Sequence, residues 1–139
     1  MIAQKPVVER LKAAGCKSVR GVLEWAGQDQ APRATPAFFV LPQGDNAQPN
    51  RMSGVIDQKV DETFGVLVVV GGQTRAGDDV DESLKIEVDR VIEQLVGWTH
   101  PAASRPTEFG SGRLLSTDGY QVAWLLSFRT ASHIRKQSQ

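Results

Sequence analysis

The chain has 139 residues, 40% of them hydrophobic, and its sixteen basic residues balance sixteen acidic ones. This length fits one domain over residues 1–139, and the balanced charge argues against sequence-specific nucleic-acid binding or attraction to an anionic membrane. No apolar run approaches the roughly 20 residues that span a bilayer, the N-terminal residues lack the apolar core of a secretory signal, and one cysteine cannot form an internal disulfide. We therefore expect a soluble protein made in a reducing cytoplasm.

The first third of the chain predicts a helix followed by two strands. Val7, Val8, Leu11 and Ala14 recur at helical spacing before Gly15, which indicates a helix of two to three turns. Residues 19–25 alternate between apolar and polar positions, which is typical of a strand. After a polar connector, residues 37–41 form a continuous apolar run between two prolines, which favours a strand buried on both faces.

The middle of the chain alternates between polar and strongly apolar segments. Residues 43–58 hold few apolar side chains, so we expect a long polar loop there, and it is the first candidate for an arm that binds a partner. Residues 57–70 are rich in β-branched side chains on both faces, which predicts a strand in the centre of the sheet. Gly71 and Gly72 should end that strand.

The clearest helical pattern begins at Asp78. Its apolar positions fall on one stripe of the helix, and they are Val80, Leu84, Val88, Val91, Ile92 and Leu95. Charged residues occupy the other side, and Lys85 and Asp89 have the i, i+4 spacing at which opposite charges meet. Asp78, Asp79, Asp81 and Glu82 crowd the first turn, where carboxylates favour the unpaired backbone N–H groups. Gly97 predicts the end of the helix, and Pro101 prevents its resumption.

The C-terminal part predicts a hairpin. Two strand-like segments, residues 107–116 and 120–130, flank Asp118 and Gly119, and an Asp-Gly pair favours a tight turn between antiparallel strands. Alternation along the second segment predicts one core face and one face that is open or shared with a partner. Residues 131–139 are polar and basic, so we expect a loose tail. Together these elements predict an α+β fold, with a mainly antiparallel or mixed sheet and helices packed on one face.

No catalytic, cofactor or metal site emerges from the residue pattern. Cys16, His100 and His133 lie in unrelated settings, and neither histidine has a ligand partner at metal spacing. The acidic group at the first turn of the long helix lacks the spacing of a calcium loop, so capping explains it better. The glycines at 71–72 and 110–112 match no phosphate-binding pattern and indicate turns or strand irregularities. Arg113, Arg129 and Arg135 could form a basic edge, although scattered arginines are more often only solvated.

The order of several segments carries a family resemblance. The segments are the apolar run 36–42, the strand 64–70, the helix ending at 95–101, the short stretch 112–114 and the last strand, 120–130. In this order and spacing, the chain resembles the tail terminator, or tail-completion, proteins of tailed bacteriophages. The resemblance implies an α+β subunit that forms a ring, commonly a hexamer, which caps the tail tube and ends its polymerisation.

Several expectations follow from the resemblance. The partners would be other copies of the chain, the tail tube protein and the head-tail connector protein. The protein would be a virion component at the head-proximal end of the tail, assembled in the cytoplasm of the bacterial host and encoded by a phage or prophage. No local motif transfers contact residues, so Arg51, Trp98, Arg113 and Arg129 are selected by residue type and expected exposure.

Two other functions remain open from the sequence. One is a small enzyme or ligand-binding domain with a pocket around Tyr120, His100 and the acidic residues 78–82. The other is a different ring protein of the phage neck or baseplate, which would share the assembly chemistry but have another neighbour. We expect no catalytic activity and no cofactor.

Overall fold

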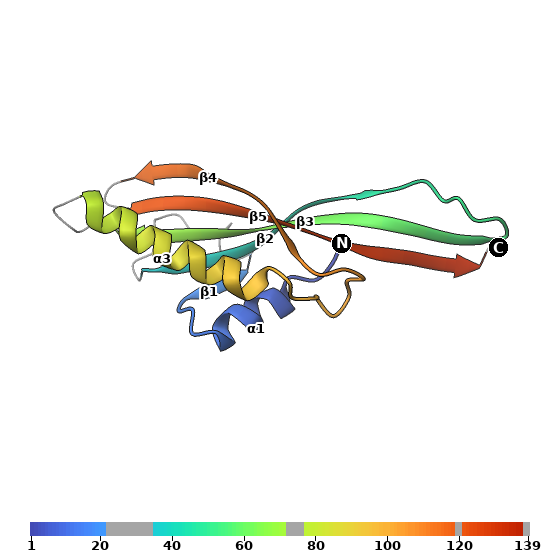
Figure 1. Ribbon diagram of the computed structural model, residues 1–139, viewed down its shortest axis with the longest axis horizontal. Coiled ribbons are helices and arrows are strands. Elements are labelled where there is room, and N and C mark those ends of the chain that lie inside the picture. The colour runs from blue at the N-terminus through green and yellow to red at the C-terminus, as the bar shows by residue number, and fades with distance from the viewer. Residues whose placement is uncertain (22–34, 72–76, 119–120, 138–139) are drawn as a thin grey trace.

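The computed structural model describes residues 1–21, 35–71, 77–118 and 121–137, without the side chains of residues 77–79 and 118. Two helices and five strands lie in these ranges (Figure 1). In chain order they are α1 (Lys5–Ala13), β1 (Val19–Gly21), β2 (Ala37–Ala47), β3 (Val55–Gly71), α3 (Gly77–Leu95), β4 (Glu108–Asp118) and β5 (Gln121–Gln137). The second half of the strand predicted at 19–25 lies outside the described residues.

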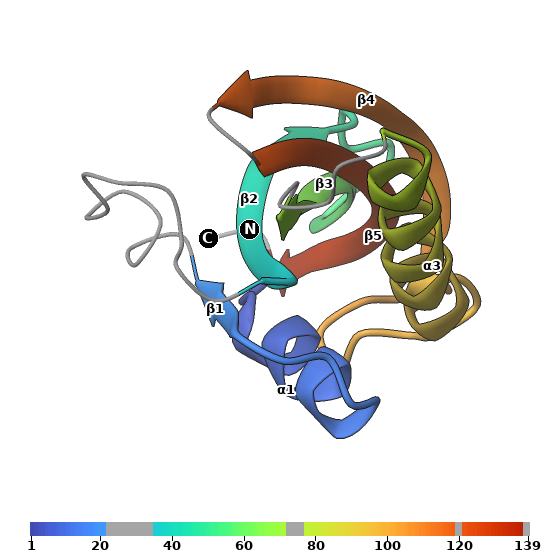
Figure 2. The ribbon, with the colours of Figure 1, turned by 90° about the vertical axis from the view of Figure 1, so that its left-hand side faces the viewer.

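The five strands form one mixed sheet in the order β1-β2-β3-β5-β4. β1 pairs with β2 in parallel, and the other three pairings are antiparallel. β3 is central, as its run of β-branched residues predicts, because apolar residues on both sides of a strand favour a place between other strands. Figure 2 shows that the sheet is strongly curled and that β4 forms its outermost arc.

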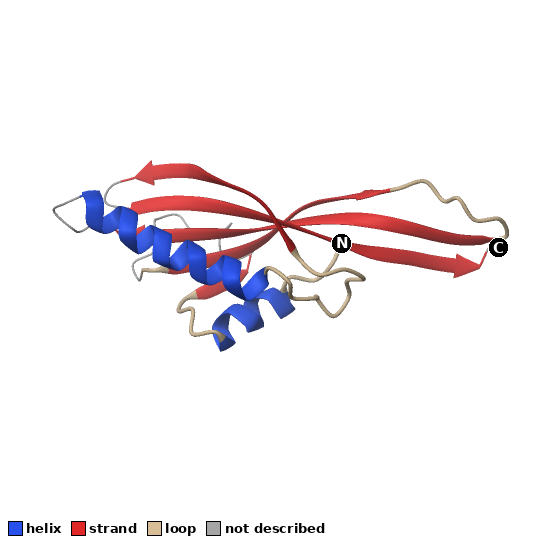
Figure 3. Cartoon of the chain, viewed as in Figure 1, coloured by secondary structure: helices blue, strands red, loops and turns tan. Residues whose placement is uncertain are grey.

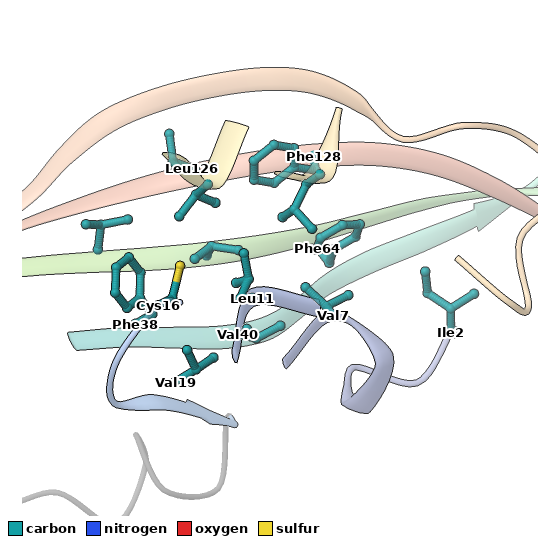
Figure 4. Close-up of a cluster of buried hydrophobic side chains, with 14 of the residues drawn as sticks. Ile2, Val7, Leu11, Cys16, Val19, Phe38, Val40, Phe64, Leu126 and Phe128 are labelled. Carbon is teal, nitrogen blue, oxygen red and sulfur yellow. The ribbon is translucent and has the colours of Figure 1, made fainter. Parts of the chain in front are cut away.

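Both helices pack on one face of the sheet, which confirms the predicted α+β architecture. Phe38 on β2, Phe64 and Val66 on β3 and Phe128 on β5 are fully buried beneath them. Figure 4 shows Val7 and Leu11 of α1 pointing into the same cluster. From α3, Val91 and Leu95 are fully buried, and the other four apolar positions of the predicted stripe are partly buried against the cluster. The helical spacing of apolar residues therefore identified the core-facing sides correctly.

The face of the sheet opposite the helices is also apolar in its middle. Phe39 is fully buried there, beside Leu67, Val69, Ala123 and Leu125. The expectation that this face of β5 is open was wrong for Ala123 and Leu125, which are only 6% and 7% exposed. A curled sheet encloses its own side chains more than a flat one does, and periodicity alone does not reveal that curvature.

Two segments predicted as irregular are strands. Residues 43–47 belong to β2 and residues 55–58 to β3, so the predicted polar loop at 43–58 shrinks to residues 48–54. Residues 131–137 continue β5, so they are not a loose tail; residues 138 and 139 lie outside the described residues. Both predictions failed because they used apolar content, whereas these strands are held by backbone pairing between polar residues.

The helix ends and the hairpin follow the sequence closely. Gly97 has φ +85°, and its N–H donates to the carbonyl oxygen of Thr107 at 2.9 Å. β4 and β5 form the predicted hairpin, but Asp118 pairs with Gln121, so Asp118 is the last residue of a strand and not a central residue of the turn. We expected Asp78 and Asp79 to cap the start of α3, but their side chains are not among those that the structure describes.

Candidate functional site: a projecting arm and a free strand edge

A three-stranded arm projects from the body of the protein (Figures 1 and 3). We define the arm as residues 44–47 of β2, 55–63 of β3 and 129–137 of β5, with the loop 48–54. Its strands pair residue by residue, from Thr63 and Arg129 at the root to Val55 and Gln137 at the tip. Neither helix covers it in Figure 1, so backbone pairing and local polar contacts hold it together.

Asn50 organises the loop at the arm tip. Its side-chain N–H groups donate to the carbonyl oxygens of Met52 and Val55, and its side-chain oxygen accepts from the N–H groups of Met52 and Asp57. Before it, the N–H of Gln48 donates to the carbonyl oxygen of Lys59 at 2.8 Å. This use of an asparagine to bond nearby backbone is typical of ordered turns. The loop at 48–54 is therefore built as part of the arm.

One face of the arm carries an ion-pair cluster around Asp57. Its carboxylate lies 3.0 Å from Nδ1 of His133 and 3.5 Å from Nε of Arg135. The hydrogen bond with His133, together with the charge of Arg135, holds the pKa of Asp57 below its usual value. Apart from Asp57, the outer half of the arm, residues 48–60 and 131–137, contains no acidic residue and four basic ones: Arg51, Lys59, Arg135 and Lys136. The outer half of the arm is therefore basic.

Polar contacts also fix the root of the arm. Glu62 is only 3% exposed, accepts a hydrogen bond from Oγ of Ser132 at 2.9 Å and lies 3.7 Å from the amino group of Met1. The same amino group lies 3.0 Å from Asp45 of β2. A buried carboxylate with these partners resists displacement, because breaking the contacts would leave a charge without compensation. The arm is thereby anchored to the N-terminal segment as well as to the sheet.

β4 forms an edge of the sheet and exposes apolar side chains. Phe109, Leu114 and Leu115 are 39%, 51% and 42% exposed, and every residue from 108 to 117 is classed as exposed. Two irregularities in its pairing with β5 occur at Phe109/Ser111 and Leu114/Ser116. Gly112 allows the backbone of β4 to lie close to Trp124 of β5, since a Cβ at this position would lie 2.8 Å from Nε1 of Trp124. Gly110 thus lies at a strand irregularity, as the sequence indicated, whereas Gly112 pairs in register with Leu126.

The four residues selected as contacts from the sequence are spread over the molecule. Arg51 is exposed in the loop at the arm tip, and Arg113 is exposed on β4. Arg129 lies at the arm root, where it lines a cavity of about 420 Å³ with Arg105 and Glu108. Trp98 is partly buried on the helical side of the sheet. The guanidinium carbon of Arg10 lies over its ring, 5.2 Å from the ring centroid. The structure does not bring the four together, and their role as contacts stays a prediction.

Sequence reasoning missed the apolar part of this surface. The sequence predicts Phe109, Leu114 and Leu115 only as residues of a strand. It predicts a loose tail around Ile134, which is 51% exposed on the arm. A signal was present, because Leu114 and Leu115 are adjacent in a strand, where neighbours point to opposite faces. In a regular strand, two adjacent leucines would not both face one core.

Of the residues considered for an enzyme pocket, His100 is described in full, and it is buried and hydrogen-bonded. His100 is 2% exposed, and its Nδ1 accepts a hydrogen bond from the N–H of Ala102. Because Nδ1 is the acceptor, the ring proton is on Nε2, which donates to the carbonyl oxygen of Ala3 at 2.6 Å. It therefore ties the N-terminal segment to the loop after α3. Tyr120 and the side chains of Asp78 and Asp79 lie outside the described set. Within the described ranges, no group of three or more metal-ligating side chains is found, and no helix is long and apolar enough to cross a membrane.

A protein-family model matches the chain over its full length. The family model described as "Phage tail terminator protein" matches residues 1–139, which is the whole chain. None of the curated proteins compared with the chain matches its sequence.

Proposed function

We propose that this chain, which belongs to the phage tail terminator protein family, forms a closed ring that caps the tail tube, ends its polymerisation and provides the surface for head-tail joining. The family membership implies a virion component that associates with other phage tail components, and it suggests a structural protein without catalytic activity. The ring, its hexameric state and its two neighbours, the tail tube protein and the head-tail connector protein, are the proposed part.

The free edge of β4 is the observation that carries the proposal of a ring. Its three large apolar side chains remain 39–51% exposed in the single chain. The outer edge of β4 has backbone N–H and C=O groups that pair with no described strand, and they lie beside exposed apolar surface. Such an edge favours pairing with another chain, which would remove the apolar surface from water. A repeated head-to-tail contact of one chain with the next produces a ring when the rotation closes.

The arm gives such a ring a second element for contact. It extends beyond the helix-covered body (Figure 1), and its strands pair residue by residue. In a ring, an element of this kind can reach a neighbouring copy or the tube beneath. Its basic outer half favours a partner surface with acidic or neutral character.

The proposal is tested by the mass of the protein in solution and by negative-stain images of the largest species. The ring predicts particles with a central opening and a mass about six times the 15.1 kDa of one chain. Addition of tail tubes of the same phage should place these rings at one tube end. Rings bound elsewhere on the virion would favour a neck or baseplate protein. A protein that stays monomeric and does not bind tail tubes would contradict the proposal.

A further inference from the structure

We propose that the outer edge of β5 in the arm of one copy, residues 132–137, pairs with the outer edge of β4 on the next copy. This interface rests on the proposed ring and names the surfaces that close it. The two edges lie on different parts of the same chain. Each copy can therefore pair its arm edge with one neighbour and its β4 edge with the other neighbour. Such a contact is heterologous, as a ring of more than two subunits requires.

Both edges lack a partner strand in the described structure. β4 is the last strand of the sheet order, so its outer side faces no described strand. On β5, pairing with β4 stops at Arg129, and the loop before β4 reaches only as far as the carbonyl oxygen of Ala131, which accepts from the N–H of Ser104. Residues 132–137 therefore leave one row of backbone groups available, over about 20 Å of extended strand.

The remaining long edge is poorly suited to strand pairing. Beyond Val40, the last residue of β2 with a described partner in β1, the outer side of β2 continues through Pro42. Proline has no N–H to donate, so it interrupts the row of backbone hydrogen bonds that an added strand would need. Proline is a common protection of an edge against pairing. The outer edge of β4 contains no proline, and three of its side chains are large and apolar.

Pairing of like edges is disfavoured for two separate reasons. An arm against an arm would bring together two surfaces that each hold four basic residues and one acidic residue. β4 against β4 would give a two-fold contact, which closes at two subunits and leaves the arm edges without a β4 edge to pair with. By contrast, β4 holds two acidic residues and one basic residue, so it does not repel the arm.

The proposed pairing also gives partners to the exposed apolar side chains. Ile134 is 51% exposed in the middle of the arm edge. On β4, the exposed apolar residues that could contact it are Leu114 and Leu115. Cross-strand contact of such side chains is a main source of stability between strands. Arm and β4 thus supply backbone groups and apolar surface to each other.

Two variants mixed together test the interface. Ile134→Asp blocks the arm edge but keeps β4 intact, and Leu114→Asp blocks β4 but keeps the arm. Each variant alone should lose the ring and run as a monomer in light scattering. An equal mixture should give a species of twice the monomer mass and nothing larger, because only one intact arm and one intact β4 edge can meet. Ile86→Asp, at a 58% exposed position on α3, should still form rings.

The outcomes separate this interface from the ring itself. If wild-type protein forms rings and both variants also form them, the arm-to-β4 contact is wrong while the ring stands. If Leu114→Asp loses the ring but Ile134→Asp keeps it, or the mixture stays monomeric, the edges do not pair with each other. If wild-type protein forms no ring even with tail tubes present, the proposed function fails and the interface fails with it. Circular dichroism of each variant should match wild type, since both positions are exposed.

Discussion

Phe64 of β3 and Phe128 of β5 stack with their ring centroids 5.5 Å apart at the point where the two strands leave the body and become the arm. Both rings are fully buried, and Phe109 of β4 meets Phe128 edge-on at 5.8 Å. This aromatic group is the last apolar layer before the arm. It couples the core beneath the helices to the element that we propose makes the subunit contact.

Phe128→Ala should lower the free energy of unfolding by about 3–5 kcal/mol, because it removes a fully buried ring and leaves a cavity. Denaturant titration at low protein concentration measures this loss. Ile86→Ala is the matched control, and its effect should stay within about 0.5 kcal/mol because Ile86 is 58% exposed. Equal effects of the two substitutions would contradict the placement of the core.

The orientation of α3 is tested by one substitution at two positions of the helix. Val91→Asp places an unpaired carboxylate where the side chain has no exposed surface, so we expect no cooperative folding. Ile86→Asp adds the same charge on the exposed side of the same helix and should fold. Thermal melts followed by circular dichroism distinguish them, and a wild-type melt for Val91→Asp would show that the helix faces another way.

Gly112→Ala should disturb the contact between β4 and β5. A Cβ at this position would lie 2.8 Å from Nε1 of Trp124, so the indole or the strand must move. We expect a loss of about 1–3 kcal/mol and a shift of tryptophan fluorescence. Gly21→Ala is the control, since nothing lies within 4 Å of a Cβ there. Unchanged stability and fluorescence in Gly112→Ala would contradict the close approach of β4.

The arm should loosen in acid. The pKa of Asp57 is lowered by its contacts with His133 and Arg135, so these contacts stabilise the folded arm at pH values above the ordinary aspartate pKa of about 3.9. That stability disappears as the pH falls through the lowered pKa of Asp57. Amide protection in residues 55–59 and 133–137, corrected for intrinsic exchange, measures it. Asp57→Asn should remove the pH dependence; an identical acid response in the variant would assign it to other groups.

Cys16 should react slowly with thiol reagents in the folded protein. Burial beneath the helices raises the pKa of its thiol, and the thiolate is the reactive form. Labelling with a maleimide at pH 7 should therefore become much faster in denaturant. Fast labelling of the native protein would show that the packing of α1 against the sheet opens readily.

The parts of the fold that follow from apolar periodicity were predictable. The stripe from Val80 to Leu95 identified α3 and its buried side, and the valines around Leu67 identified the central strand. Both signals arise because burial selects apolar residues at the period of the element. The order of these segments was also enough to identify the family before the fold was known.

The candidate site was less predictable, because its arm depends on backbone pairing and polar contacts and not on an apolar stripe at a regular period. Asn50, Asp57 and His133 organise it, and such polar residues favour loops in any estimate based on composition. Their partners are up to 76 residues away in sequence. Only the pairing of distant strands converts these polar segments into an ordered arm, and a single sequence does not state which strands pair.

Termination of the tail tube is tested most directly by the length of tubes assembled in vitro from the tube protein of the same phage. The tubes are grown with and without this protein, and their lengths are measured in electron micrographs. We expect that stoichiometric addition stops growth and leaves a ring on one end of each tube, while Leu114→Asp leaves growth unchanged. Tubes that grow equally long with the wild-type protein, and carry no ring, would contradict the proposed termination of the tube.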